Sequence, residues 1–290
     1  MATVVNNGMI PTALVTELFQ GVRGDSALAK LAPQAPIPFK GMTEFVFSLD
    51  HEASVVGEAQ PKVAGGVTVT SKVVRPIKFE YGARFSYEMW RLGEEERLSI
   101  LRTFIEGARR KFARGFDIAA MHGFNPYSGT ASAVIGTNNL DAQITNDITY
   151  ASATPRKNIT DAVALVVAND GDINGIAVSP TLAGLLASEL NSGIPANPEF
   201  YNNLKPERFL GVPTQVNTTV SNGSVSHAYL GDWNAFRWGY AAEIPYEVIE
   251  YGDPDNTGHD LKGYNEIYLR AEAFIGWAVL DPSVLAKVEI

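Results

Sequence analysis

The segment from Asp170 to Gly175 has the ligand spacing that opens a calcium-binding loop. Asp170, Asp172 and Asn174 occupy the first, third and fifth positions of such a loop, and Gly175 occupies the sixth. The twelfth position, where a bidentate glutamate completes the site, is Thr181. Without that ligand the pattern is more typical of a turn rich in Asp, Asn and Gly. We therefore expect no metal and no cofactor to copurify with this chain.

No other residue pattern predicts catalysis. The four histidines lie far apart, and none belongs to a zinc-protease motif; they are His51, His122, His227 and His259. The absence of cysteine excludes disulfides, thiolate metal sites and cysteine nucleophiles. The chain has no GxSxG, Walker A, GxGxxG or kinase signature. The sequence thus predicts a protein that is not an enzyme, and a hydrolase built on scattered Ser, His and Asp residues is a distant alternative.

The charge balance argues against a dedicated nucleic-acid binder. The 290 residues include 23 Lys and Arg but 32 Asp and Glu, a net charge of −9, whereas phosphate binding needs an excess of cations. The basic run Arg109-Arg110-Lys111 with Arg114 is more often a solvated helix face than a phosphate site. No apolar run approaches ~20 residues, and Met1 to Ile10 does not resemble a signal peptide, so we expect a soluble protein that is not exported.

A very long strand must organise the fold. Val67 to Ser86 alternate between apolar and polar residues for twenty positions, which predicts a strand of about 65 Å at ~3.3 Å per residue. The alternating stretch from Phe45 to Leu49 can pair with it, joined through a Gly-rich connection from Asp50 to Gly66. The compact body of a chain this size cannot cover such a strand. Part of this hairpin should therefore project as an arm whose apolar face needs another molecule.

The rest of the chain contains an extended start, one long helix and an α/β region. Three prolines between residues 33 and 38 predict an extended segment within residues 1–40. Apolar residues at helical spacing predict an amphipathic helix over 94–121, which ends near Gly123. Helices near 159–168 and 181–190 alternate with strands near 176–179, 209–216, 227–230 and 246–250. Period-two alternation returns over 267–279, and a last strand follows Asp281-Pro282.

This order of parts resembles the major capsid proteins of tailed bacteriophages, which have the Hong Kong 97-type fold. Local segments are similar too. The similar segments are Asp50 to Glu58, Val74 to Lys78, Phe85-Ser86, Phe116-Asp117 through Gly123, Leu210 to Pro213, Gly231-Asp232-Trp233 and Leu269 to Ala271. The resemblance covers nearly the whole chain and rests on the shared order of these weak motifs. It predicts an α+β capsid fold.

The resemblance implies a division into four parts. Residues 1–40 would be the N-terminal arm and 41–80 the extended loop, a β-hairpin. Residues 81–158 with 256–290 would form the peripheral domain around the spine helix 94–121, and 159–255 would form the inserted axial domain. Relatives often begin with a cleaved helical scaffold, whereas here Met1 leads almost directly into the arm. We therefore expect either a separate scaffolding protein or none.

The implied function is self-assembly into an icosahedral bacteriophage shell of pentamers and hexamers that encloses the DNA genome. Portal or decoration proteins and non-specific contact with double-stranded DNA would follow, without membrane contact; assembly would take place in the bacterial cytoplasm and the protein would reside in the virion. The extended loop would contact the neighbouring subunit through six residues: Val55, Val56, Glu58, Lys62, Val69 and Val73. Lys62 or Lys72 could supply the amine of a covalent crosslink, but noncovalent assembly is preferred. A cellular nanocompartment shell of the same fold is the nearer alternative.

Overall fold

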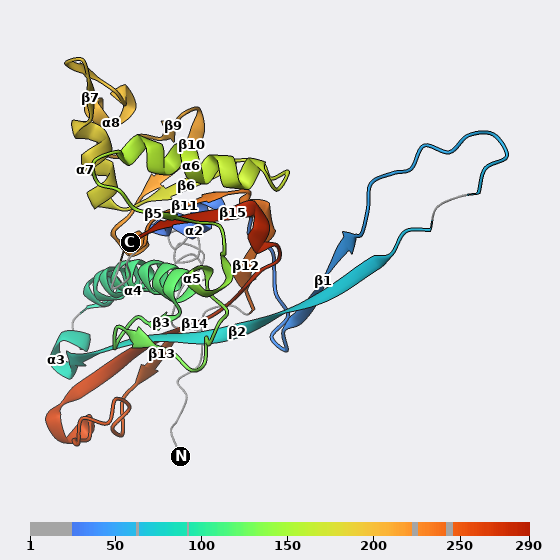
Figure 1. Ribbon diagram of the computed structural model, residues 1–290. Helices are drawn as coiled ribbons and strands as arrows, with labels where there is room; N and C mark the ends of the chain where they lie inside the picture. The colour runs from blue at the N-terminus through green and yellow to red at the C-terminus, as the bar shows by residue number, and fades with distance from the viewer. Residues whose placement is uncertain (1–24, 62–63, 92, 222–225, 242–245) are drawn as a thin grey trace.

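The computed structural model describes residues 25–61, 64–91, 93–221, 226–241 and 246–290. These residues form two large and two small β-sheets; the two large sheets pack against the long helix α4 (Glu94–His122), and one end of a large sheet projects as a hairpin (Figure 1). The hairpin, helix, α/β region and returning strands follow each other in the predicted order, and residues 1–24 of the predicted arm lie outside the described residues. The prediction of an α+β fold is confirmed.

The larger sheet is built around β2 (Val67–Ser86), which spans the whole predicted alternating stretch. Its strand order is β1-β2-β14-β12, and β13 also pairs with β14. All of these pairings are antiparallel, and β14 runs along β2 from Trp277 opposite Arg75 to Glu266 opposite Ser86. The other strands are β1 (Met42–Leu49), β12 (Phe236–Tyr240), β13 (Tyr246–Ile249) and β14 (Glu266–Val279).

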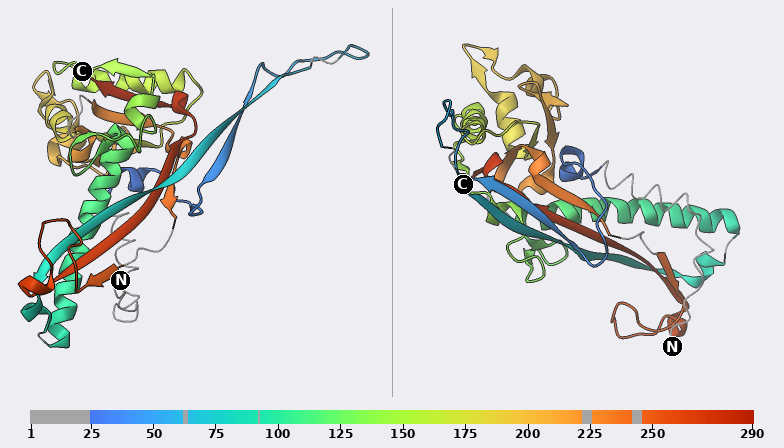
Figure 2. Two further views of the ribbon diagram at one scale, coloured as in Figure 1. Left: turned by 90° about the horizontal axis from the view of Figure 1, so that it is seen from below. Right: turned by 90° about the vertical axis from the view of Figure 1, so that its right-hand side faces the viewer.

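Helix α4 covers one face of the larger sheet, and the apolar residues of β2 and β14 pack against it (Figure 2). Aromatic rings fill the contact. The ring centroid of Phe104 in α4 lies 6.0 Å from that of Tyr81, and the ring centroid of Phe116 lies 5.7 Å from that of Trp277. The helix begins at Glu94, as predicted, and ends one residue later than predicted. Gly123 ends it, because its φ of 71° lies in the left-handed region that glycine adopts without strain.

The smaller sheet has six strands, but they are short. Their order is β5-β15-β11-β6-β10-β9. Helices α6 (Pro155–Val167) and α7 (Pro180–Ser188) pack on it through Ile159, Val166 and Leu182, which are fully buried. Its strands are β5 (Asp147–Thr149), β6 (Gly175–Val178), β9 (Arg208–Phe209), β10 (Val212–Val216), β11 (Ser226–Gly231) and β15 (Leu285–Glu289). Long-range pairing of β15 therefore ties the C-terminus to this sheet.

Each of the two large sheets contains strands from inside and from outside the range 159–255. Strands β12 and β13 lie within 159–255 but belong to the larger sheet, whereas β5 and β15 lie outside that range and belong to the smaller one. The chain thus crosses between the sheets more often than a simple insertion requires. Pairing partners far apart in sequence cause this difference, and strand propensity carries no information about them.

The remaining helices and strands are short. They are α2 (Ala27–Leu31), α3 (Tyr87–Trp90), β3 (Phe124–Asn125), β4 (Thr130–Ala131), α5 (Leu140–Gln143), β7 (Leu190–Asn191), β8 (Ile194–Pro195), α8 (Pro198–Asn202), η2 (Thr218–Ser221), η3 (Trp233–Ala235), η4 (Lys262–Tyr264) and η5 (Pro282–Val284). After α2, the extended segment 33–41 runs along β12, where the amides of Ala35 and Ile37 donate to the carbonyls of Trp238 and Tyr240.

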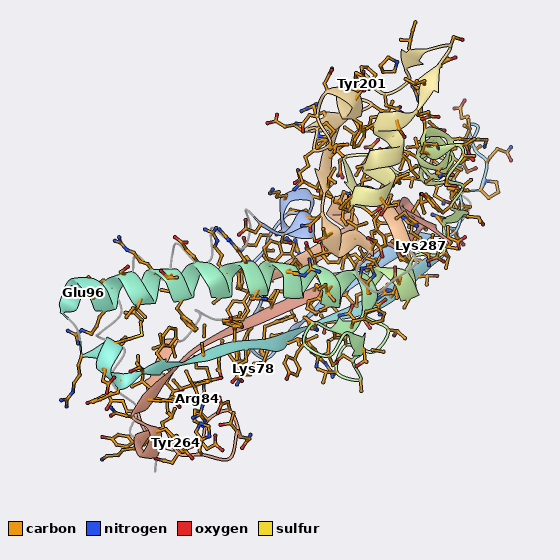
Figure 3. All side chains as sticks on the ribbon, turned by 90° about the vertical axis from the view of Figure 1, so that its left-hand side faces the viewer. Lys78, Arg84, Glu96, Tyr201, Tyr264 and Lys287 are labelled. Carbon is orange, nitrogen blue, oxygen red and sulfur yellow. The ribbon has the colours of Figure 1, made fainter. Side chains whose placement is uncertain are left out.

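The face of the larger sheet away from α4 carries ion pairs. Arg84 of β2 makes three of these ion pairs: with Glu266 at 2.9 Å, with Asp253 at 2.8 Å and with Asp255 at 2.5 Å. These bonds hold the loop after β13 against the sheet, near Tyr264 (Figure 3). They also lower the pKa of Asp255 well below its usual range, mainly through the hydrogen bond from Arg84.

Candidate assembly interface

The projecting hairpin exposes one continuous apolar face. Phe47 lies opposite Val69, and Leu49 lies opposite Val67, so these side chains share one side of the two-stranded ribbon. Phe47 is 67% exposed and Leu49 is 74% exposed, and Val67 and Val69 are exposed as well. Phe45 and Val73 extend the same face toward the body. Six large apolar side chains in one row are far more than a surface strand usually exposes.

The same face of β2 is covered in its second half. Phe79, Tyr81 and Phe85 continue the alternation of Val67 and Val69, but they pack against α4 and the core of the larger sheet. The strand therefore has a uniform apolar side, of which α4 covers only the C-terminal half. A second protein surface is needed to cover the N-terminal half.

The tip of the hairpin is polar and open. Asp50 accepts a hydrogen bond from the amide of Gly66 at 2.8 Å, which closes the paired part. Hydrogen bonds to the carbonyls of Glu52 and Ala64 raise the pKa of the neighbouring His51. Beyond this point Ser54 to Gln60 form no strand and are exposed. Such a segment adds little to the core of its own chain.

The structure brings the predicted contact residues together only in part. Val69 and Val73 lie on the apolar face of the hairpin, whereas Val55, Val56 and Glu58 lie in the open tip; Lys62 lies outside the described residues. Their contacts with a neighbour stay predictions. Sequence reasoning left Phe45, Phe47 and Leu49 out of the contact set. Their alternation opposite Val67 and Val69 was the signal for including them.

A buried carboxylate fixes the helix to the rest of the body. Asp117 of α4 is fully buried and accepts hydrogen bonds from the hydroxyl of Ser26 at 2.5 Å and from the amide of Ala27 at 2.9 Å. The hydroxyl of Thr219 in η2 donates to it at 3.0 Å. Burial raises the pKa of Asp117, and these donors oppose that shift by stabilising the anion. One carboxylate thus joins α2, α4 and η2.

A second polar contact lies one turn further along α4. Nδ1 of His122 faces the carboxylate of Asp141 at 2.8 Å, and Nε2 faces the carbonyl of Thr219 at 2.8 Å. The hydroxyls of Ser226 and Tyr229 also donate to Asp141. Burial raises the pKa of Asp141, but His122 and these hydroxyls outweigh it and leave the pKa below its ordinary value.

Thr219 is therefore held from two sides. Its hydroxyl donates to the carboxylate of Asp117, and its carbonyl faces Nε2 of His122; both of these residues lie on α4. Sequence reasoning placed Asp117 in a helix end typical of the resembling family but did not predict these contacts. Asp117 and His122 follow each other at helical spacing, yet nothing in the sequence links them to Thr219.

The segment from Asp170 to Gly175 is built as a turn. Asn174 accepts from the amide of Trp233 at 2.8 Å and donates to Asp232 at 2.6 Å, so its side chain fixes η3. No cluster of three or more His, Cys, Asp or Glu side chains suited to a metal occurs in the described part of the chain. Among the same residues, no helix combines the length and apolar character needed to span a bilayer.

Comparison with known proteins places this architecture among phage structures. No protein-family model and no curated protein matches the chain. A solved structure from Mycobacterium phage Ogopogo is 29% identical, with a TM-score of 0.78, over 91% of this chain and 92% of that one. A structure from Gordonia phage Cozz is 26% identical, with a TM-score of 0.74, over 91% of this chain and 86% of that one.

Capsid structures share the fold at lower identity. The capsid of an empty GTA particle is 12% identical, with a TM-score of 0.64, over 92% of this chain and 90% of that one. The GTA capsid thus shares the overall fold of this chain. The predicted resemblance to tailed-phage major capsid proteins is confirmed: the chain is similar along most of its length to these phage structures, and it shares the fold of the GTA capsid.

Proposed function

We propose that this chain is the repeating subunit of an icosahedral bacteriophage head, built from pentamers and hexamers. The observation that carries the proposal is the apolar face of the hairpin, which α4 covers in one half of β2 and leaves bare in the other. A neighbouring copy supplies the missing cover. Residues 41–80 act as the extended loop, 1–40 as the arm, 81–158 with 256–290 as the peripheral domain and 159–255 as the axial domain.

Burial of this face between copies supplies the energy of assembly. Apolar area removed from water stabilises a contact by ~25 cal/mol per Å², so an interface of about 1,000 Å² contributes several kcal/mol after its costs. A closed shell repeats this contact at every subunit. Weak contacts thereby add up to a strong container, and the protein has a structural rather than a catalytic role.

The proposal extends to the contents and the place of the shell. The protein resides in the virion after assembly in the bacterial cytoplasm, and scaffolding, portal or decoration proteins take part. Double-stranded DNA is contacted without sequence preference. The net charge of −9 supports release of the genome, because a strongly basic lining would retain DNA through counterion release.

Removal of the hairpin tip tests the proposal. We replace residues 50–66 by a tight turn between Leu49 and Val67, which leaves both sheets and α4 intact. We expect cooperative unfolding of the monomer to stay nearly unchanged, while negative-stain microscopy finds no closed shells. Normal shells from the shortened protein would contradict the proposed role of this segment. Loss of folding would show instead that the tip belongs to the core of its own chain.

A nanocompartment shell of the same fold is the remaining alternative. Two solved structures that are 29% and 26% identical to this chain come from phages, which favours a phage head. The contents of purified particles separate the two functions. Double-stranded DNA supports the proposal, whereas packaged enzymes would contradict it.

A further inference from the structure

Helix α4 has a strongly basic segment in an acidic protein. Residues 97–114 include six basic side chains and one acidic side chain, Glu106, although the whole chain has a net charge of −9. The basic residues are Arg97, Arg102, Arg109, Arg110, Lys111 and Arg114. The apolar face of the same helix is buried against the larger sheet, so the charged residues must lie on its other face.

Three of these residues form an exposed row. At about 100° per residue, Arg102, Arg110 and Arg114 fall within ~120° of the helix circumference, opposite the buried Phe104 and Phe112. Figure 3 shows nitrogen-tipped side chains standing off α4 on the side away from β2 and β14. Lys111 is also exposed, but it lies about 60° beyond Arg114, on the flank of the helix next to β2. The row extends for about 18 Å at ~1.5 Å per residue.

At least half of these cations have no carboxylate partner in the described part of the chain. Arg109 binds Asp25 at 3.1 Å, and Arg114 donates to the hydroxyl of Thr218 at 2.7 Å. Arg102, Arg110 and Lys111 have no carboxylate partner among the residues that the structure describes. Some cations elsewhere are paired: Lys157 pairs with Asp161, and Arg237 pairs with Glu44. A polyanion is the partner that this charge pattern fits.

We propose that the exposed face of α4 around Arg102 and Arg110, with Lys111 on its flank, is the surface that contacts packaged double-stranded DNA. This inference rests on the proposed function, since it needs a shell that encloses DNA. Duplex DNA carries one charge per ~1.7 Å of its axis, so a row of about 18 Å faces roughly ten phosphates. Three unpaired cations per subunit bind it weakly and without sequence preference, because they contact phosphates rather than base edges.

The surface reconciles the acidic composition with DNA contact. Carboxylates elsewhere keep the net charge negative, and the basic residues are restricted to one helix. Each subunit therefore holds the duplex through only a few salt-sensitive contacts. The genome is positioned against the wall and is still free to leave.

A charge-removal variant tests this surface. Arg102→Gln, Arg110→Gln and Lys111→Gln together remove three exposed cations that make no ion pair in the described structure. Lys40→Gln, Lys157→Gln and Lys205→Gln remove the same charge from exposed positions outside α4. Binding of the unassembled protein to a short mixed-sequence duplex is followed by fluorescence anisotropy at about 50 to 200 mM salt.

We expect the α4 variant to flatten the plot of log affinity against log salt by about two to three units, since each lost phosphate contact accounts for ~0.9. The control variant should change this slope by less than one unit. In DNA-filled particles, acetylation of Lys111 should be several-fold slower than in emptied ones, whereas acetylation of Lys205 is equal in both. Equal salt slopes for the two variants, or equal labelling of Lys111 in filled and emptied particles, would overturn the inference.

Two further outcomes separate this inference from the proposed function. If wild-type protein forms no shells while the α4 variant still loses DNA affinity, the capsid role fails and the DNA surface stands. If the α4 variant binds DNA like the control but no longer assembles with a co-expressed acidic scaffolding protein, the face is a protein-docking surface. That result overturns the inference and leaves the capsid role intact.

Discussion

Gly239 of β12 and Gly276 of β14 lie directly opposite each other in the larger sheet, and the extended segment after α2 passes over both of them. A Cβ atom at Gly239 would lie 1.7 Å from the carbonyl oxygen of Ala35, and one at Gly276 would lie 3.1 Å from Cδ1 of Ile37. The two glycines thus provide the space in which the arm joins the sheet.

Substitution of Gly239 by alanine should detach or displace the arm. The clash is with backbone, which cannot rotate away, so we expect a loss of about 1–3 kcal/mol in the free energy of unfolding. Urea denaturation measures it. Gly107→Ala is the matched control: it lies in α4 with open space around it, and it should stabilise the protein by about 1 kcal/mol. A Gly239→Ala protein as stable as wild type would contradict this packing.

Thr219→Val tests the contact that joins η2 to α4. Valine keeps the shape of threonine but removes the donor to the buried Asp117, and we expect a loss of about 1.5–3 kcal/mol, typical of a hydrogen bond to a charged group. Thermal or urea unfolding measures the change. Thr103→Val is the control. Thr103 is exposed on α4, and its hydroxyl donates to the carbonyl of Ser99 on the surface of that helix. Equal losses in the two variants would show that Thr219 is not held as described.

Acid should weaken the contact between His122 and Asp141. The pKa of Asp141 is lower in the folded protein than in the unfolded chain, so this carboxylate contributes stability above pH ~4 and loses it as the pH falls through its folded pKa. We expect Asp141→Asn to be less stable than wild type near pH 6, and the difference to shrink toward pH 3. Urea unfolding at several pH values measures it. A difference that stays constant with pH would contradict the ion pair.

Elements with strong periodicity could be predicted from the sequence. The alternation over 67–86 defined β2 with correct limits, and the helical spacing over 94–121 defined α4 to within one residue. Local patterns suffice here because each element buries one face along its whole length. The projection of the hairpin was predicted from strand length, since a strand of twenty residues is too long for the body of the protein to cover.

Contacts between distant segments could not be predicted. Nothing in the residues near Leu285 indicates that β15 pairs with both β5 and β11, or that β12 leaves the α/β region for the larger sheet. The polar contacts of Asp117 and His122 depend on the same pairings. The bare apolar face was only partly recognised, because Phe45, Phe47 and Leu49 become contact candidates only when their register with β2 is known.

The particle mass of the purified protein tests the central claim most directly. Light scattering of the wild-type chain, alone and with a co-expressed scaffolding protein, should find closed or partly closed shells of megadalton mass. Phe47→Ser with Val69→Ser, which alters a cross-strand pair exposed on the hairpin, should leave monomer unfolding nearly unchanged and abolish the shells. A wild-type protein that stays a monomer of about 31 kDa at every concentration and salt, even with the scaffold, would contradict the account.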